Sequence, residues 1–314
     1  MVEHGISATH AVVTMDAAIP GIIWGWMITL NMWAKSVGTG VILVGAYLLY
    51  RYKKEDIPSL RWLMPLISFI FLNIFLLFTL TDLHQPYRMI NIFIHPHWTS
   101  AITVGAWMAS LFTLLITIML VISYVDAHPD FARHNGLAKT AREHSGFYEK
   151  IFPFVVFLAI PVTLYTAIIM AESSARELWQ APTELMQMML AAFMAGSAAL
   201  VFISGSWTKD ARKDLAVVLV LAVFFSFLMY MGEYFFSFKS EKEATLEYVH
   251  SGGEYNVQFW LAMALGYIIP FFLGISAMKS DNKTLLRFAA ILALIGLYLA
   301  KDVWLKIPQM LPLS

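Results

Sequence analysis

The sequence contains no cysteine and few charged residues. The absence of Cys from its 314 residues excludes disulfides, thiol nucleophiles and an iron–sulfur cluster held by cysteines of this chain. Lys, Arg, Asp and Glu make up only 13% of the chain, against about a quarter in a typical soluble domain. The 21 basic residues balance the 21 acidic ones, so the net charge does not point to nucleic acid as a partner.

Apolar residues dominate the composition instead. Hydrophobic residues make up 59% of the chain, and its mean hydropathy is +0.68. Because a membrane-spanning helix needs about 20 apolar residues, we predict an all-α integral membrane protein with one transmembrane domain over residues 1–314. Eight apolar runs are expected to cross the lipid bilayer, arranged as two four-helix bundles. They cover residues 22–50, 62–81, 98–124, 151–171, 183–204, 215–236, 257–278 and 285–304.

The distribution of Lys and Arg predicts the orientation of these spans. One set of alternate loops holds fourteen of these residues, whereas the other set, together with both termini, holds six, among them Lys301. Because the basic side of a membrane protein faces the cytoplasm, both termini are expected outside. In a bacterium this means the periplasmic side of the inner (cytoplasmic) membrane.

The nine histidines lie in predicted loops or at helix ends. A membrane cytochrome needs His side chains at mid-membrane depth to ligate haem iron, so no haem is expected. His95 and His97 have no third ligand close in the sequence. An interfacial turn is therefore favoured over a metal site at this pair.

Lys35 is an ionisable residue deep inside the first predicted span. It lies 13 residues past Ile22, hence roughly 20 Å from the outer end of the span. Asn31 stands four residues earlier and therefore on the same helical face. The small residues of SVGTG, 36–40, follow and allow another helix or a flat ligand to approach closely.

Further polar residues fall in the outer half of other spans. They are Asp82, Tyr165, Glu172 and Glu233. Because ionisable residues inside a membrane are costly and usually functional, we predict a polar pocket near the outer face. Each residue also has an ordinary explanation. Asp82 could cap a helix, Tyr165 could belong to the interfacial aromatic belt, Glu233 could end a wetted helix, and Lys35 could form a structural ion pair.

Two segments resemble a known family. Residues 81–107, TDLHQPYRMINIFIHPHWTSAITVGAW, resemble the signature that joins spans two and three of the NrfD, or polysulfide reductase membrane-subunit, family. The matching positions are Asp82, Leu83, Pro86, Arg88, Ser100, Gly105 and Trp107, whereas His84 and Ala101 depart from the pattern. A second match runs through LYTAIIM to Arg176, Trp179, Pro182 and Gly196. The resemblance covers about the first 205 residues.

The resemblance implies a membrane anchor that exchanges electrons with a menaquinone-type quinone near the outer face. It also implies two partners, which are a periplasmic iron–sulfur subunit and a catalytic subunit that can contain molybdenum. The polar position of the family's first helix falls at Asn31, the acid of the second at Asp82, and the tyrosine of the fourth at Tyr165. Lys35 has no counterpart in the family pattern.

The residues themselves are compatible with quinone chemistry. A quinone site needs an apolar slot, hydrogen-bond donors and a group that takes or gives protons. We expect Asn31, Tyr165 and His84 to donate, Asp82 or Glu233 to carry protons, and Lys35 to stabilise an anion.

The chain has no electron acceptor of its own, so redox function requires an iron–sulfur partner. Together with these residues, the resemblance implies a quinone-interacting subunit of a periplasmic respiratory oxidoreductase of the polysulfide or sulfur-compound type, active in anaerobic respiration. Arg88, residues 90–97 and Arg176 are expected to contact the iron–sulfur subunit. Two alternatives stay open. One is a secondary transporter that uses the same polar cluster, although no inverted repeats are visible. The other is an anchor without quinone chemistry.

Overall fold

The computed structural model describes residues 21–83, 85–130, 136–173, 176, 178–236 and 245–310. All regular structure in these ranges is helical. Eight helices are long and apolar enough to cross a membrane, which confirms the predicted number. They are Trp26–Arg51 (α1), Leu60–Asp82 (α2), Ala101–Ala127 (α4), Gly146–Ala171 (α7), Ala181–Val201 (α8), Lys209–Phe236 (α9), Asn256–Ser280 (α11, η3 and α12 in succession) and Lys283–Met310 (α13).

Short helical segments connect or interrupt these spans. Within the seventh span, α11 (Asn256–Ala262) passes through one π-helical stretch, η3 (Met263–Ile268), into α12 (Ile269–Ser280). The other short segments are η1 (Pro86–Ile90), α3 (Asn91–Ile94), α6 (Gly136–Glu143) and η2 (Ser204–Ser206).

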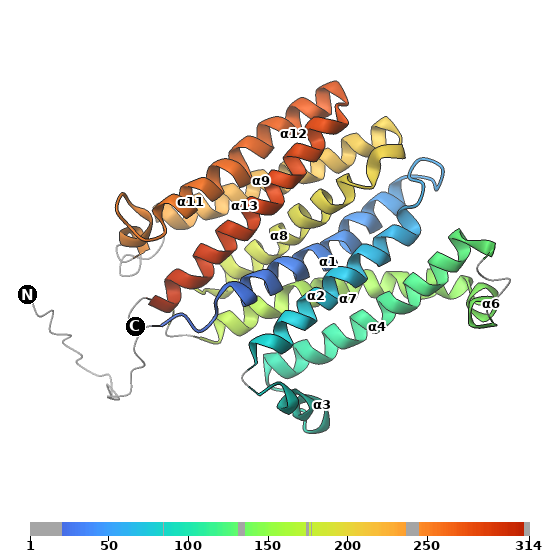
Figure 1. Cartoon of the computed structure of the whole chain (residues 1–314), viewed down its shortest axis with the longest axis horizontal. Helices are drawn as coiled ribbons and strands as arrows, with labels where there is room; N and C mark the ends of the chain where they lie inside the picture. Colours follow the sequence, from blue (N-terminus) through green and yellow to red (C-terminus); the bar gives the residue numbers. More distant parts are fainter. Residues whose placement is uncertain are drawn as a thin grey trace, which may run out of the picture.

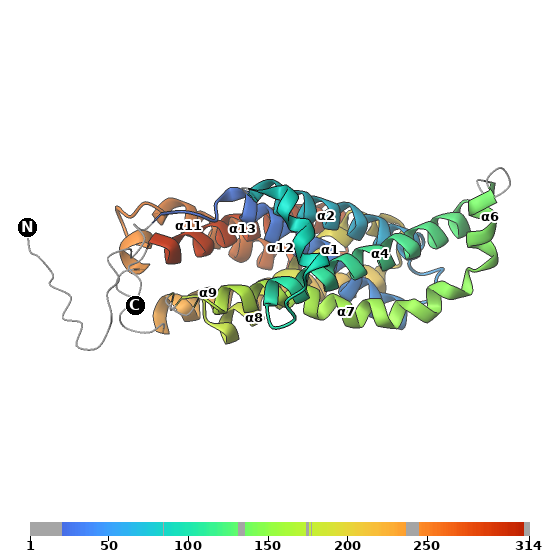
Figure 2. The same ribbon diagram turned by 90° about the horizontal axis from the view of Figure 1, so that it is seen from below.

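The long helices lie side by side in an elongated body, with α3 projecting at one end and α6 at the other (Figures 1 and 2). Both ends of the described chain lie at the end that carries α3. The side-chain oxygen of Gln309 there accepts hydrogen bonds from the backbone N–H groups of Ile23 and Trp24, at 3.0 and 2.8 Å. We call this the outer end, after the predicted orientation.

The central contact of the fold is between α1 and α8. A Cβ added at Gly40 would collide with the backbone of Ala192, and a Cβ added at Gly196 would collide with the backbone of Gly40. The two helices therefore approach to backbone contact because these positions have no side chain. The small residues of SVGTG were expected to allow close approach of either a helix or a flat ligand. At Gly40 the structure shows a helix, α8. Because α1 packs along α8 as well as α2, the division into two four-helix bundles stays a prediction.

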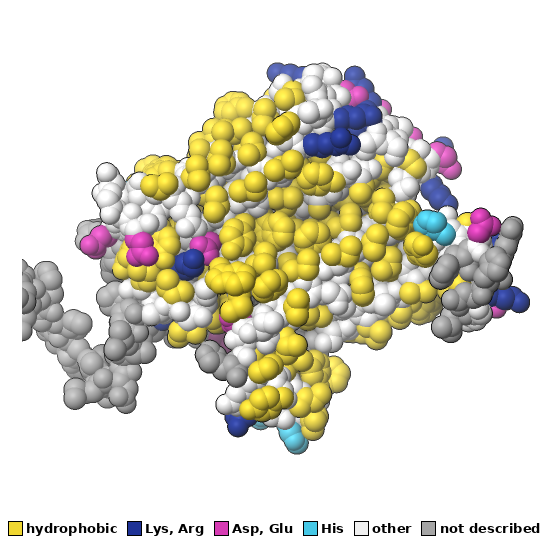
Figure 3. Space-filling model, in the orientation of Figure 1, with side chains coloured by type: hydrophobic (Ala, Val, Ile, Leu, Met, Phe, Trp, Pro, Cys, Tyr) yellow, Lys and Arg dark blue, Asp and Glu magenta, His cyan; other side chains and the backbone are white. Residues whose placement is uncertain are grey.

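The surface divides into an apolar band and a basic end. Hydrophobic side chains cover the sides of the long helices in Figure 3, and Lys and Arg gather toward the end that carries α6 and the connection between α1 and α2. Large apolar side chains such as Phe157 and Phe272 are about two-thirds exposed on the flanks, at 66% and 65%. A water-soluble monomer rarely exposes so large an apolar surface, so this band is the expected lipid-facing belt.

At the basic end, an ion pair ties α9 to the turn between α12 and α13. The Arg212 guanidinium donates to both carboxylate oxygens of Asp281, at 3.1 and 2.7 Å. These hydrogen bonds hold the pKa of the Asp281 carboxyl below its usual value. Asp281 also adopts a left-handed backbone conformation with φ of 51°, which Asp tolerates better than most residues. The turn is thereby fixed at the end opposite Lys35.

The α1–α8 contact yields a matched test. Gly40→Ala should lower the Tm of the purified protein, because the added methyl meets backbone that cannot move aside, at a cost of about 1–3 kcal/mol. Gly232→Ala, within α9, has nothing within 4 Å of its new Cβ and should leave the Tm unchanged or raise it. Thermal unfolding of both variants in detergent checks this. Equal Tm values would contradict the proposed role of the α1–α8 contact.

Candidate functional site

Lys35 is fully enclosed in the outer half of α1. Its exposed fraction is 1%, although its neighbours on α1 are almost all apolar or small. The structure begins α1 at Trp26 rather than Ile22. Lys35 is therefore nine residues, roughly 14 Å, from the outer end of the helix, which is shallower than the sequence predicted. Between Lys35 and Arg51, at the other end of α1, there is no Asp, Glu, Lys, Arg or His.

The Lys35 ammonium is held by α7. Its Nζ donates to the hydroxyl Oγ1 of Thr166 and lies 4.5 Å from the centre of the Tyr165 ring. A cation over an aromatic face is attracted by the ring quadrupole, most strongly where water is excluded. No Asp or Glu within the described ranges lies at ion-pair distance from Lys35. The contacts that hold this charge are thus a neutral ring and a hydroxyl, and no direct ion pair is present.

Tyr165 is positioned by α4. A Cβ at Gly105 would overlap the Tyr165 ring, so the missing side chain of Gly105 creates the space into which the ring packs. About one turn deeper, the Thr163 hydroxyl donates to the Thr39 hydroxyl at 2.8 Å and joins α7 to α1. The ring orientation over Lys35 therefore depends on α1, α4 and α7 together.

Asn31 faces α2 and differs from its predicted role. Its side-chain N–H₂ donates to the Phe75 carbonyl at 2.9 Å and to the Thr79 hydroxyl at 2.6 Å. Both donors are used inside the protein, so Asn31 has no N–H left for a quinone oxygen. Its carbonyl oxygen Oδ1 receives no hydrogen bond from the described residues, which makes it an acceptor. The sequence could not reveal this, because Phe75 and Thr79 belong to a different helix.

The other predicted residues are distributed as follows. Asp82 is the last residue of α2, partly buried, one turn beyond Thr79. Glu172 is exposed just after α7. Glu233 lies on α9 and interacts with α8 rather than with Lys35. His84 lies outside the described residues. The structure thus brings Lys35 and Tyr165 together. Asn31 lies one turn away on α1 but contacts α2, and Glu233 is not part of this group.

Two buried ionisable residues were missed by the sequence analysis. Glu184 on α8 is 2% exposed and Lys301 on α13 is 5% exposed. The placement of Lys301 among outer-side residues was wrong, since α13 continues to Met310 and encloses it. Both lie within or beside predicted apolar runs, so the rule that intramembrane ionisable residues are functional candidates would have selected them had it been applied at the span ends.

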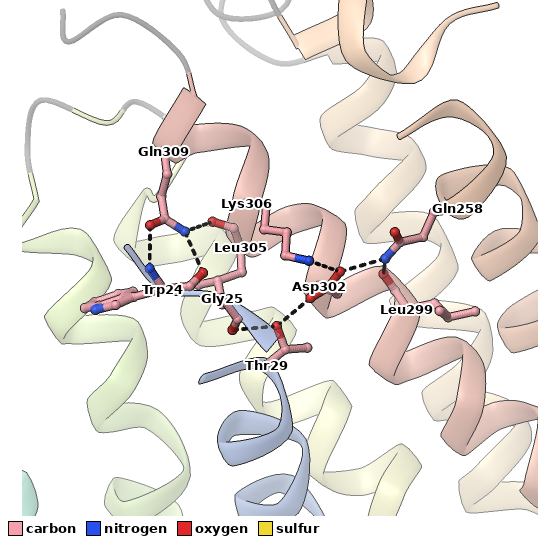
Figure 4. A network of polar contacts seen from close by, with 9 residues as sticks. All are labelled: Trp24, Gly25, Thr29, Gln258, Leu299, Asp302, Leu305, Lys306 and Gln309. Carbon is pink, nitrogen blue, oxygen red and sulfur yellow. Dashed lines mark hydrogen bonds and ion pairs between the residues drawn. The ribbon is translucent and has the colours of Figure 1, made fainter. Parts of the chain in front are cut away.

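A separate network at the outer end is fully bonded. Asp302 on α13 accepts hydrogen bonds from Thr29 of α1 and from Gln258 of α11, both at 2.9 Å, and pairs with Lys306 at 2.7 Å (Figure 4). Gln309, one turn past Leu305, fastens the chain entering α1, as Figure 4 also shows. Because each Asp302 oxygen has a partner, this network is suited to holding α1, α11 and α13 together.

A cavity of about 660 Å³ opens at the opposite end of the molecule. It is lined by the inner ends of α1, α2, α4 and α7, with Arg61, Trp62 and Tyr148 among the lining residues. Ala46, the lining residue of α1 nearest to Lys35, is eleven residues further along α1, roughly 16 Å. The cavity is therefore distinct from the polar cluster around Lys35.

The amino-acid sequence matches a known family. A family model described as "Polysulphide reductase, NrfD" matches residues 15–310. The chain belongs to the NrfD polysulphide reductase family. NrfD proteins are membrane subunits of polysulfide reductase-type complexes. The NrfD match includes all eight spans, so it extends well beyond the 205 residues on which the sequence resemblance rested. The comparison with curated proteins returned no significant match.

The packing of Tyr165 against Gly105 predicts a measurable coupling. Gly105→Ala should destabilise the protein, because the new methyl displaces the ring. In a Tyr165→Ala background the same change should cost much less, since the ring is gone. Residues in direct contact typically give coupling energies of about 0.5–3 kcal/mol. Thermal or denaturant unfolding of the four variants measures the coupling, and strict additivity would contradict the contact.

Proposed function

We propose that this chain exchanges electrons with a quinol of the menaquinol type at the Lys35 site, and passes them to an iron–sulfur subunit of a bacterial respiratory oxidoreductase. The proposal also places the chain in the inner membrane with both termini in the periplasm. The observation that carries it is the buried Lys35 ammonium, which contacts Thr166 and Tyr165 and has no carboxylate at ion-pair distance among the described residues.

The polar atoms available around Lys35 fit the two oxygens of a quinone. An ammonium has three N–H groups, and Thr166 accepts from one of them. The others remain to bind a quinone oxygen through a charge-assisted hydrogen bond. Asn31 offers an acceptor, which suits the hydroxyl of the reduced form. A bound quinol supplies two electrons and two protons. Lys35 would hold the oxygen from which a proton departs and stabilise negative charge on it.

Asp82 is proposed as a proton-handling group at the mouth of this site. It ends α2, the helix that also holds Asn31 through Phe75 and Thr79. A partly buried carboxylate at that boundary would be able to exchange protons with outer solvent. Tyr165 is proposed to position Lys35 through its ring.

The electrons must leave at the end where the quinol binds, since the chain has no cysteine and its described residues include no group of three potential metal ligands. The η1–α3 segment projects from this end (Figure 1). It exposes apolar side chains, with Tyr87 at 73% and Ile94 at 60%. Arg176 is instead fastened to the Pro308 carbonyl of α13. We therefore assign the contact with the iron–sulfur subunit to η1 and α3 rather than to Arg176.

Lys35→Met tests the quinone site directly. The variant should assemble normally but bind a hydroxyquinoline N-oxide, a quinol analogue, more weakly by about 1–3 kcal/mol for a lost hydrogen bond to a charged group. This corresponds to about 5- to 150-fold in Kd. Fluorescence titration of the purified protein measures it. Lys283→Met, an exposed lysine at the opposite end, is the matched control and should bind as the wild type does. Wild-type affinity in Lys35→Met would refute the site.

The partner surface is tested by photo-crosslinking in the native complex. A photoreactive residue at Ile94 should form adducts with the iron–sulfur subunit, because this side chain is exposed on the projecting segment. The same residue at Phe157, exposed on the lipid-facing flank of α7, should label lipid only. Adducts from Ile94 that contain only lipid, in a complex shown to be intact, would count against the assignment.

A further inference from the structure

A second group of buried polar side chains lies between α8, α9, η3 and α13. We call it the polar chamber, and define it as Glu184, Gln187, Tyr230, Tyr267, Lys301 and Trp304. Direct contacts join several of these residues. The Lys301 ammonium lies 3.4 Å from the sulfur of Met188, one turn beyond Glu184. The Tyr230 ring is 5.6 Å, centre to centre, from both Tyr267 and Trp304. Four helical segments thus contribute to one enclosed site.

The polar atoms of the chamber lack protein partners. Glu184 Oε1, Gln187 Nε2, the Tyr267 hydroxyl and Trp304 Nε1 are all buried and form no hydrogen bond with other described groups. Glu184 and Lys301 interact electrostatically but are not within direct ion-pair distance. Buried polar groups in native proteins are satisfied by protein or by ordered water, and an internal water needs two to four polar partners. The chamber therefore has the donors and acceptors that a chain of internal waters requires.

The charged groups are ordered by depth along the membrane axis. Lys35 and Lys301 each lie nine residues from the outer ends of their helices, roughly 14 Å. Gln187, Tyr230 and Trp304 lie six residues from theirs, roughly 9 Å. Glu184 and Glu233 lie three residues from theirs, roughly 5 Å. The helix α1 that carries Lys35 packs against α13, which carries Lys301, and α8, which carries Glu184, packs against α9, which carries Glu233. Lys35 and Lys301 repel each other, as do Glu184 and Glu233. The series therefore leads outward from the Lys35 site.

We propose that the polar chamber is a hydrated proton route between the Lys35 site and the outer surface, in which Glu184 passes the proton on to Glu233. The proposal rests on the quinol chemistry proposed above. Oxidation of one quinol releases two electrons, which go to the iron–sulfur partner, and two protons, which travel outward through internal water, Glu184 and Glu233. Each carboxyl gives up the proton that it accepts, so the chain ends the cycle unchanged. Quinone reduction uses the same route inward.

The groups that face Glu184 define its environment. They are Lys301 from α13 and Tyr230 and Glu233 from α9. Beyond them, the Tyr267 ring of η3 contacts Tyr230, and Lys35 of α1 repels Lys301. Tyr267 lies on the π-helical stretch of the seventh span, and such single-turn insertions occur often at functional sites. Asp302 is the instructive contrast, because it is buried on the same helix as Lys301 but fully hydrogen-bonded.

Glu184→Gln in the native complex is the main test. It keeps the size of the side chain but cannot carry a proton. Turnover driven by menadiol should fall about tenfold or more, with an altered pH profile and a larger solvent deuterium isotope effect. Glu184→Asp should restore part of the rate. Asp302→Asn, the matched change in a bonded carboxylate, should leave the pH profile and isotope effect as in the wild type. Wild-type turnover with an unaltered pH profile in Glu184→Gln would overturn the route.

Tyr267→Phe gives a second test if the Glu184 variants fail to assemble. Its buried hydroxyl has no protein partner apart from the neighbouring Tyr230, so a purely structural account predicts unchanged turnover and a Tm close to that of the wild type. The proton route predicts slower menadiol turnover at unchanged Tm, and wild-type turnover would overturn its extension to η3.

Binding of the hydroxyquinoline N-oxide separates this proposal from the preceding one. Normal binding in the wild type and in Glu184→Gln, with normal turnover in both, rejects only the proton route. Absence of binding in the wild type rejects the quinone site itself.

Discussion

The backbone contact of α1 with α8 is the constraint on which both polar clusters depend. Gly40 and Gly196 let the two helices touch, and α1 also packs against α2, α7 and α13. This central position allows α1 to place Lys35 against Thr166 and Tyr165, while α8 carries the buried Glu184. A bulkier residue at the contact would separate α1 from α8 and from the helices that follow it. The positions of the Lys35 site and of the polar chamber therefore both depend on the absence of side chains at Gly40 and Gly196.

The sequence predicted the number of spans and the family, and it selected Lys35 and Tyr165, which the structure places in contact. Each of these follows from local information, namely apolar length, a linear motif, or an ionisable residue in an apolar run. The sequence did not predict that the Asn31 side-chain N–H groups donate to Phe75 and Thr79, because tertiary contacts decide which polar atoms remain free. Glu184 and Lys301 were missed for a related reason. Near the end of an apolar run a charge resembles an ordinary boundary, and only neighbouring helices reveal that it is enclosed.

The two buried carboxylates of the outer half illustrate how similar burial serves different purposes. Asp302 has a donor for every oxygen and joins three helices. Glu184 leaves one oxygen without a protein partner, which costs stability unless water supplies the missing hydrogen bond. A fully bonded network resists rearrangement, whereas an incompletely bonded one retains acceptors that change partners. A carboxyl that repeatedly gains and loses a proton needs an oxygen that is not already hydrogen-bonded to protein, and Glu184 has one.

The stretch of α1 beyond Lys35 has an energetic consequence for the cell. Its residues 36–50 contain no Asp, Glu, Lys, Arg or His, and this stretch is roughly 22 Å long. On α1, then, the groups assigned to quinol chemistry all lie outside this insulating stretch. Electrons and protons that both depart at the outer end carry no net charge through the bilayer. With quinol oxidised at Lys35 and its protons released at the outer end, as proposed above, each turnover of this chain would leave the transmembrane voltage unchanged.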